Sequence, residues 1–322
     1  MSELNLSFHT TFSLKKEDIL RMIKVAEEEE KGVKDSQENL MAKTGLGNKK
    51  VSPIKSWSIR SGLVDRETGK LTPQGAIARK HDPYLQSPIT DWLMHFYLSF
   101  SDKGLETPPP APADWGGWTW FVYSFLPQRK TFTRQELESY AGSVFTKAAK
   151  NIAKDLNILL RAYTEPHALF GCGFVKTNEK DKFAVSQANQ PNDYLIAYLL
   201  SQLWERDFGD TNSIQTREIS QQKLGLKEVL GINADALQTI LDRLEAKAII
   251  EQNRAVSPAE TIRRWHNPLD LLKKAYIEED CFFKNEVYTV RRFQSLIQKK
   301  TPFNIGDQAG QLRRERIKVN CQ

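Results

Sequence analysis

The sequence predicts a mainly α-helical fold with small β-hairpin wings, an α+β class in which tandem winged helix-turn-helix-like units surround a helical core. Three observations lead to this class. Apolar residues recur at helical spacing, glycine-marked turns separate consecutive helices, and short segments of strand character follow three of the helix pairs. The second helix of a winged helix-turn-helix usually lies in a DNA major groove, so this class makes duplex DNA a candidate partner.

The first unit is predicted between Glu38 and Gly75, inside an N-terminal domain of residues 1–80. One helix covers roughly Glu38 to Lys43. The glycines that follow allow a tight turn, because glycine reaches positive φ without a Cβ clash. A second helix comes next, and a hairpin turning at Glu67-Thr68-Gly69 would be the wing. The alternative is a helical core segment followed by a surface hairpin.

Pro53 determines where the second helix of this unit is expected to begin. Proline has no backbone N–H and clashes with the carbonyl four residues back, whereas Ser52 followed by Pro53 makes a good helix start. We therefore expect residues 48–51 to form a polar, basic turn. A helix start with nearby lysines can bind phosphate. The predicted DNA contacts here are Lys49, Lys50, Lys55 and Arg60.

Residues 81–190 are predicted to hold a helical core and a second unit. The run WTWFVYSF has no basic residue in it, which favours core packing over base stacking. Thr133 and Glu136 match a capping box at the start of one helix, and a longer helix runs from Thr146 to Ala162. The polar side of that longer helix carries the second set of predicted DNA contacts, Lys147, Lys150 and Lys154.

A third unit is predicted within residues 191–280, where Ala234 to Ala246 is strongly amphipathic. Its wing strands would be Ile249–Gln252 and Thr261–Trp265. Residues 281–322 are rich in lysine and arginine and form a predicted basic C-terminal extension. That extension suits nucleic acid or a partner protein, and a merely solvated tail is the alternative.

Composition narrows the class of protein. The 322 residues are 40% hydrophobic, which supports real cores, and the net charge of +6 with a pI of about 9.0 favours an anionic partner. Three scattered cysteines make neither a disulfide framework nor a four-cysteine zinc site. No apolar run has the length of a membrane span, and the N-terminal residues lack the pattern of a signal peptide. We expect a cytoplasmic protein.

Sequence motifs for chemistry are sparse. The chain has no Walker loop, no GxGxxG, no GxSxG and no HExxH. His81 adjoins Asp82, and His95 lies one helix later, so a small His/Asp site is conceivable. His9 stands beside two threonines. A lone histidine on an apolar helix is more often a hydrogen-bonded core residue. The catalytic candidates are accordingly His9, Asp82 and His95, and no metal ligands can be assigned.

Several short sequence segments, taken together, resemble those of one bacterial family. They are FHTTF, GLGNKKVSPIKSW, LTPQG, DPYLQSPITDWLMHF, WTWFVYSF and NIAKDLNILLRAY. The chain resembles the domain-of-unknown-function 4007 family over roughly residues 8–276, most densely before residue 165. Two departures stand out. Phe8 and Thr10 replace the glycine and glutamate that flank the histidine in the family, and Pro53 stands where the family has a helix-compatible residue.

The resemblance implies a DNA-binding component of a bacterial DNA phosphorothioation system, of the SspB type to which single-strand nicking before sulfur insertion is attributed. Such a nickase would activate water or a side-chain nucleophile with a divalent cation, for which Mg²⁺ and Mn²⁺ are the candidates, or with a strong base. The implied partners are double-stranded DNA and the ATPase and sulfurtransferase subunits of the system. One alternative is a non-catalytic adaptor or regulator that binds DNA and recruits the sulfur-transfer machinery. Another is a protein-interaction module whose winged helices bind only partner subunits.

Overall fold

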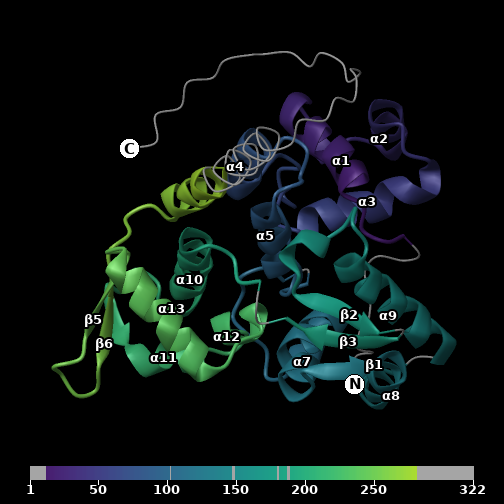
Figure 1. Ribbon diagram of the computed structural model, residues 1–322. Helices are drawn as coiled ribbons and strands as arrows, with labels where there is room; N and C mark the ends of the chain where they lie inside the picture. The colour runs from purple at the N-terminus through teal and green to yellow at the C-terminus, as the bar shows by residue number, and fades with distance from the viewer. Residues whose placement is uncertain (1–11, 102, 147–148, 180, 187–188, 281–322) are drawn as a thin grey trace, which may run out of the picture. The chain divides into compact units, whose positions relative to one another are not determined.

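The computed structural model describes residues 12–101, 103–146, 149–179, 181–186 and 189–280 (Figure 1). Met1–Ala275 make one compact unit, and a second begins at Tyr276. Helices predominate, and the strands form two small antiparallel sheets of three strands each. The mainly α, α+β class predicted from the sequence is confirmed. No helix in the described part of the chain is long and apolar enough to cross a membrane.

The first group of helices precedes both sheets. It consists of α1 (Lys16–Glu28), η1 (Gly32–Lys34), α2 (Gln37–Thr44) and α3 (Asn48–Arg60). Gly45 follows α2 with φ of 67°, so the predicted glycine turn between the two helices is present. Ser36 caps α2 by accepting a hydrogen bond from the Asn39 backbone N–H.

The predicted start of the second helix at Pro53 is wrong. Helix α3 begins at Asn48, so the expected basic turn of residues 48–51 is helical and Pro53 lies inside the helix. The N–H groups of Lys50 and Val51 both donate to the Gly47 carbonyl, at 2.8 and 3.2 Å, so the first turn closes before the proline. Proline loses one backbone hydrogen bond, but burial of the apolar face, including Ile54 and Trp57, outweighs that local cost.

The hairpin after α3 is minimal. Val64 and Leu71 form an isolated antiparallel bridge, and the Asp65 N–H donates to the Lys70 carbonyl at 2.8 Å. Gly69 in the turn has φ of 72°, a conformation that favours glycine. The segment has the path of a hairpin with one bridge in place of two regular strands.

The centre of the chain forms an aromatic core. Its elements are α4 (Pro73–His81), α5 (Pro88–Leu98), η2 (Pro112–Trp115), α6 (Gly117–Trp120), the π-helical turn η3 (Phe121–Phe125) and α7 (Leu126–Gln128). The WTWFVYSF run is buried apart from Ser124, so its predicted core role is confirmed. The rings of Trp57 and Trp118 meet edge to face at 5.6 Å, which joins α3 to this core.

The α9 group is the first of two groups built on a sheet. It comprises β1 (Thr131–Thr133), α8 (Arg134–Val144), α9 (Ala149–Thr164), η4 (Phe170–Cys172), β2 (Val175–Glu179) and β3 (Lys182–Val185), and the strand order is β1-β3-β2. Thr133 and Glu136 make the predicted capping box. Sequence reasoning gave residues 131–133 only a capping role and missed that they pair with β3.

The α13 group is the second group that is built on a sheet. It comprises α10 (Asp193–Phe208), β4 (Ser213–Gln215), α11 (Thr216–Gln221), α12 (Leu226–Leu230), α13 (Ala234–Ala246), β5 (Ile250–Asn253) and β6 (Glu260–Arg263). Its strand order, β4-β6-β5, again places the last strand in the middle. Helix α13 has the bounds that its amphipathic pattern predicts. Residues 268–280 are also helical.

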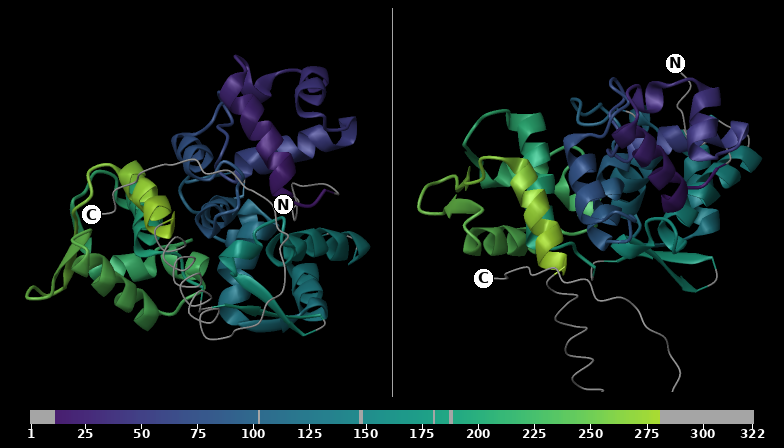
Figure 2. Two further views of the ribbon diagram at one scale, coloured as in Figure 1. Left: turned by 45° about the horizontal axis from the view of Figure 1, so that its top comes forward. Right: turned by 90° about the horizontal axis from the view of Figure 1, so that it is seen from above.

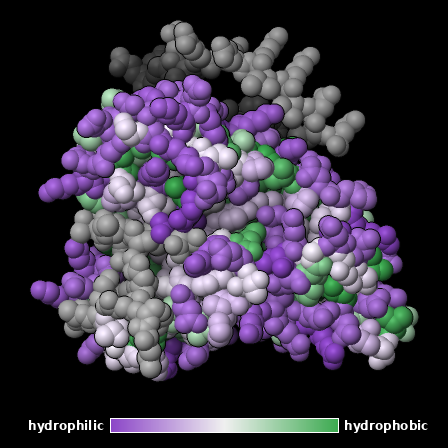
Figure 3. Space-filling view, turned by 180° about the vertical axis from the view of Figure 1, so that it is seen from behind, coloured by the Kyte–Doolittle hydropathy of each residue, from purple (hydrophilic) through white to green (hydrophobic). Residues whose placement is uncertain are grey.

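The two sheets remain apart in both views of Figure 2, each beside helices of its own group. Large apolar side chains from the first group of helices, the aromatic core, the α9 group and the α13 group are buried, among them Trp57, Phe121, Tyr163 and Trp204. On the face shown in Figure 3, hydrophilic residues predominate and hydrophobic residues emerge in small separate areas.

Candidate nucleic-acid interface

Helix α3 carries all four cations of the first predicted DNA-binding set, but the structure engages them differently. Lys50 pairs with Asp18 of α1, with 2.6 Å between Nζ and Oδ2. Arg60 donates to the hydroxyl of Ser56 one turn earlier in the same helix. Lys49 is exposed, and neither Lys49 nor Lys55 has an ion-pair partner in the described part of the chain. Two of the four cations therefore hold the fold as well as charging the surface.

Lys55 lies in a region of positive charge. Burial lowers its pKa, and the nearby Lys34 ammonium lowers it further. Lys34 itself donates to the Glu67 carbonyl in the hairpin. A bound anion beside Lys55 would offset both effects, since it would favour the charged amine.

Helix α9 presents lysines on its solvent side. Lys150 and Lys154 are exposed one helical turn apart, and neither has an ion-pair partner within the residues that the structure describes. Ile152, Leu156 and Leu159 are buried on the other side, which fixes the direction in which the lysines face. Lys147, the third predicted contact of this helix, lies outside the described residues.

The hairpin of the α9 group adds another cation. Lys176 on β2 is exposed and, as far as the described residues go, has no ion-pair partner. Lys182 on β3 pairs instead with Glu179 at 2.8 Å. Helix α9 and strand β2 thus carry three uncompensated lysines, of which the sequence reasoning missed Lys176. The signal available for it was a lysine in the short segment of strand character that follows this helix pair.

The surface around helix α13 lacks the positive charge that α9 carries. The exposed side of this helix carries Asp235 and Asp242, with Glu245 half-buried, and no lysine lies within its bounds. The cations around it are paired with carboxylates. Arg254 contacts Asp242 and Glu245, Arg264 contacts Glu251, and Arg243 lies 2.8 Å from Asp193. This surface is neutral to acidic.

His95, one of the predicted catalytic residues, is fully buried on α5. Its Nε2 lies 2.8 Å from the Val229 carbonyl oxygen, which can only accept, so Nε2 carries the proton. Burial lowers the pKa of His95 to about 4, so the ring is neutral and Nδ1 accepts from the Tyr163 hydroxyl at 2.8 Å. The same hydroxyl accepts from Trp118 Nε1 at 3.0 Å. Both ring nitrogens of His95 and the Tyr163 hydroxyl therefore have hydrogen-bond partners.

Asp82, the second predicted catalytic residue, is also nearly buried. Its carboxylate accepts hydrogen bonds from the Gln86 and Ser87 N–H groups, at 2.8 Å each, and from the Thr90 hydroxyl at 2.6 Å. These bonds hold the turn into α5. Both nitrogens of His95 are occupied elsewhere, so Asp82 and His95 do not hydrogen-bond to each other. Their geometry gives each a structural role.

A buried ion pair, missed by the sequence reasoning, lies close to Asp82. Asp91 of α5 accepts from Lys16 Nζ at 2.8 Å and from the Gly171 N–H at 2.9 Å. Burial raises the pKa of Asp91 to about 7, although the Lys16 charge opposes that rise. The available signal was a carboxylate inside an otherwise apolar helix. The contacts join α1, α5 and η4.

Metal binding finds no support in the described part of the chain, where no three His, Cys, Asp or Glu residues cluster in a way that could hold an ion. The remaining catalytic candidate, His9, lies outside that part. The assignment of His9, Asp82 and His95 as catalytic residues, and of a metal, stays a prediction.

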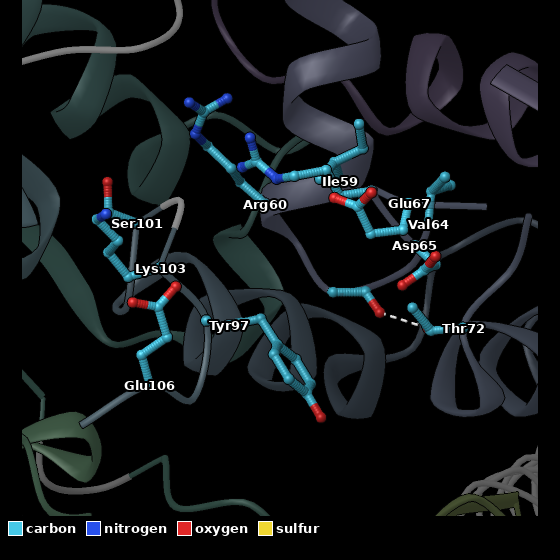
Figure 4. A pocket seen from close by; sticks show the side chains of 13 residues that line it. Ile59, Arg60, Val64, Asp65, Glu67, Thr72, Tyr97, Ser101, Lys103 and Glu106 are labelled. Carbon is cyan, nitrogen blue, oxygen red and sulfur yellow. Dashed lines mark hydrogen bonds between the residues drawn. The ribbon is translucent and has the colours of Figure 1, made fainter. Parts of the chain in front are cut away.

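Two cavities adjoin the helices that carry the lysines. One, of about 340 Å³, lies at the hairpin after α3 (Figure 4). Three cations and three carboxylates line it, so it carries no net charge that would select phosphate; they are Arg60, Arg66, Lys103, Asp65, Glu67 and Glu106. The other, of about 450 Å³, lies between the end of α9, η4 and β2, and no carboxylate lines it.

Comparison with solved structures identifies two of similar fold, described as "Magnesium ion-bound SspB crystal structure" and "SspB crystal structure". Each has a TM-score of 0.61 and 16% sequence identity, and each alignment covers 85% of this chain and 87% of that chain. At this identity the likeness shows the fold alone. No curated protein matches the chain. The profile of one family matches residues 6–276, most of the chain, so the protein belongs to the family described as "Protein of unknown function (DUF4007)".

Proposed function

We propose that this protein is a duplex-DNA-binding component of a DNA phosphorothioation system. The observation that carries the proposal is the uncompensated basic surface of Lys150 and Lys154 on α9 and Lys176 on β2. Lysines without carboxylate partners can bind phosphates at little cost, because no existing ion pair has to break. The association with phosphorothioation comes from the family resemblance, and the SspB-like fold supports it.

The arrangement of the α9 group supports a winged helix-turn-helix interpretation. Strand β1, helices α8 and α9, and the hairpin β2–β3 follow one another, with β3 between β1 and β2. In this interpretation α9 is the recognition helix and the hairpin is the wing. Its lysines would contact the backbone on both sides of a groove, which fixes register without reading sequence. Lys49 and Lys55 on α3 would add contacts from the first group.

The test is duplex binding at several salt concentrations with the variant Lys150→Glu/Lys154→Glu. We expect a loss of affinity of about tenfold or more and a shallower salt dependence, by roughly 0.9 log unit per log unit of salt for each lost phosphate contact. The matched control is Arg217→Glu/Lys223→Glu, which makes the same charge change at two exposed residues of the α13 group. Equal losses in both variants would contradict a specific interface on α9.

Single-strand nicking is the second candidate activity. The magnesium ion bound to one similar SspB structure favours it, as does the family resemblance. Relaxation of supercoiled plasmid to open circle with Mg²⁺ or Mn²⁺, abolished in His9→Ala, would establish it. Asp82→Ala and His95→Ala belong in the same assay, with thermal unfolding measured alongside because both side chains support the fold. Intact plasmid with every metal, together with salt-sensitive duplex binding, would establish the non-catalytic adaptor.

A further inference from the structure

The cavity beside α9 has an exposed aromatic residue at its edge. Phe170 of η4 is 55% exposed, whereas Phe174, only four residues later, is fully buried. Single exposed apolar residues are common on protein surfaces, so exposure alone would carry no conclusion. This ring, however, lines a cavity of about 450 Å³, within the size range of small-ligand sites.

The backbone that carries Phe170 is held firmly. The Leu169 N–H donates to the Ala162 carbonyl at 2.7 Å, and the Gly171 N–H donates to the buried Asp91 carboxylate at 2.9 Å. A Cβ at Gly171 would lie 2.5 Å from that carboxylate oxygen, so this close approach requires glycine. Asp91 is in turn fixed by Lys16. The ring is therefore exposed on a rigid turn that needs no reordering when it meets a ligand.

The polar lining of the cavity is suited to a nucleobase and its phosphate. Among the residues that the structure describes, Lys176 has no ion-pair partner and no carboxylate lines the cavity. Asn189 offers an amide that can both donate to and accept from a base edge, and Thr177 adds a hydroxyl. An aromatic face beside a cation and an amide is the combination with which proteins hold unstacked bases.

We infer that this cavity binds one unstacked nucleobase of DNA, stacked on Phe170, with Lys176 on an adjacent phosphate. The inference rests on the proposed function, because the cavity is made by the end of α9 and by β2, the two elements that carry the uncompensated lysines. That continuity points to DNA rather than to a free small molecule. The same contact would let the protein distinguish interrupted or locally opened duplex from fully paired duplex.

The experiment compares a fully paired duplex with the same duplex carrying one extrahelical 2-aminopurine. Wild-type protein should quench 2-aminopurine fluorescence on binding and should bind the bulged duplex about tenfold more tightly, given the size of base–aromatic stacking effects. Phe170→Ala should lose both the quenching and the preference, while Phe170→Trp should keep them. Lys176→Gln should weaken binding and reduce the salt slope by about one contact.

Tyr84→Ala is the matched control, because Tyr84 is 69% exposed and does not line the cavity. It should behave as wild type. Equal affinity of wild type for both duplexes, or unchanged quenching in Phe170→Ala, would overturn the inference while leaving duplex binding intact. Failure of wild type to bind the paired duplex at low salt would instead overturn the proposed function. Phe170→Ala should unfold close to the wild-type temperature, since more than half of the side chain is already exposed.

Discussion

The α9 group and the α13 group share a chain order of strand, helices and hairpin, with the last strand in the middle of each sheet. They differ in how their charges are paired. On α9 and β2, Lys150, Lys154 and Lys176 have no carboxylate partners in the described structure. Around α13, the side chain of Arg254 is held by Asp242 and Glu245.

This difference shows that topology and charge carry separate information. Buried apolar faces determine how strands and helices order themselves, and both groups have such faces. The solvent side is free to vary, and there the α9 group leaves positive charge unpaired while the α13 group neutralises it. A phosphate backbone would gain attraction from the first surface and little from the second.

One buried residue, His95, hydrogen-bonds to both groups. His95 contacts Tyr163 at the end of α9 and, through Nε2, the Val229 carbonyl of α12 in the α13 group. A neutral imidazole thus links the two groups by hydrogen bonds within the core. The first two predictions concern His95 and its buried surroundings, the third concerns charge pairing on α3, and the fourth concerns the surface of the α13 group.

The largest effect is expected for His95→Ala. The substitution opens a cavity in the aromatic core and leaves the buried Val229 carbonyl without its donor, so we expect a loss of about 3 kcal/mol or more in the free energy of unfolding. Urea unfolding followed by tryptophan fluorescence measures it. If the residue couples the two groups, the single transition should also broaden or split. Wild-type stability in the variant would exclude the proposed connecting role.

The second prediction concerns acid pH, where His95 and Asp91 act in opposite directions. Burial depresses the pKa of His95 from 6.5 to about 4, so the unfolded chain binds more protons between these values and stability falls as the solution is acidified. Across that pH range the His95 shift changes the free energy of unfolding by on the order of 3 kcal/mol. Burial raises the pKa of Asp91 from 3.8 to about 7, so the folded state binds more protons between these values. The stability that this adds is fully present below pH 3.8 and is lost as the pH rises through 7.

The two groups thus give the free energy of unfolding opposite pH dependences, which substitution of either residue can separate. In Asp91→Asn only the His95 slope remains, so the free energy of unfolding should fall more steeply than in wild type between pH 6.5 and 4.5. In His95→Gln it should fall less steeply or rise. Urea unfolding at both pH values tests each slope. Wild-type pH dependence in both variants would show that neither group titrates as its burial requires.

Sequence patterns predicted several of the helices, because apolar periodicity directly reports burial. Helix α13 has the predicted bounds, and the capping box at Thr133 is present. The start of α3 could not be predicted from Pro53, since the local cost of proline is overridden by tertiary packing of Trp57. Strand β1 was missed because a three-residue strand has no periodicity of its own and depends on β3 for its hydrogen bonds.

The candidate site was less predictable, because ion pairing depends on contacts between distant residues. Nothing local distinguishes Lys50, which is paired with Asp18, from Lys49, which has no such partner. The environment of His95 is likewise made by Tyr163 and Val229, far away in the sequence. Charge on a helix face can be predicted from sequence, whereas its compensation cannot.

The third prediction compares two neighbouring lysines of α3, one exposed and one paired with a carboxylate. Lys49→Gln should weaken duplex binding about two- to fivefold and leave thermal unfolding unchanged, because Lys49 is exposed and has no ion-pair partner among the described residues. Lys50→Gln should instead lower the unfolding temperature, since it leaves the nearly buried Asp18 carboxylate without its partner. Filter binding and calorimetry on the two variants distinguish the cases. A stability loss in Lys49→Gln alone would reverse the assignment.

The smallest effect is expected when the α13 group is made to resemble the α9 group. Asp242→Asn/Glu245→Gln removes two carboxylates and frees Arg254, which is already more than half exposed. Exposed ion pairs contribute little to stability, so the fold should lose less than about 1 kcal/mol. Duplex affinity at low salt should rise by about two- to threefold, because one more phosphate becomes reachable, and the gain should vanish at high salt.

The same substitutions can be combined with Lys150→Glu/Lys154→Glu. An equal gain in affinity in that combined variant would show that the two surfaces bind DNA independently. A gain only in the wild-type background would mean that α9 must engage DNA first, and that charge pairing around α13 limits how far the interface extends.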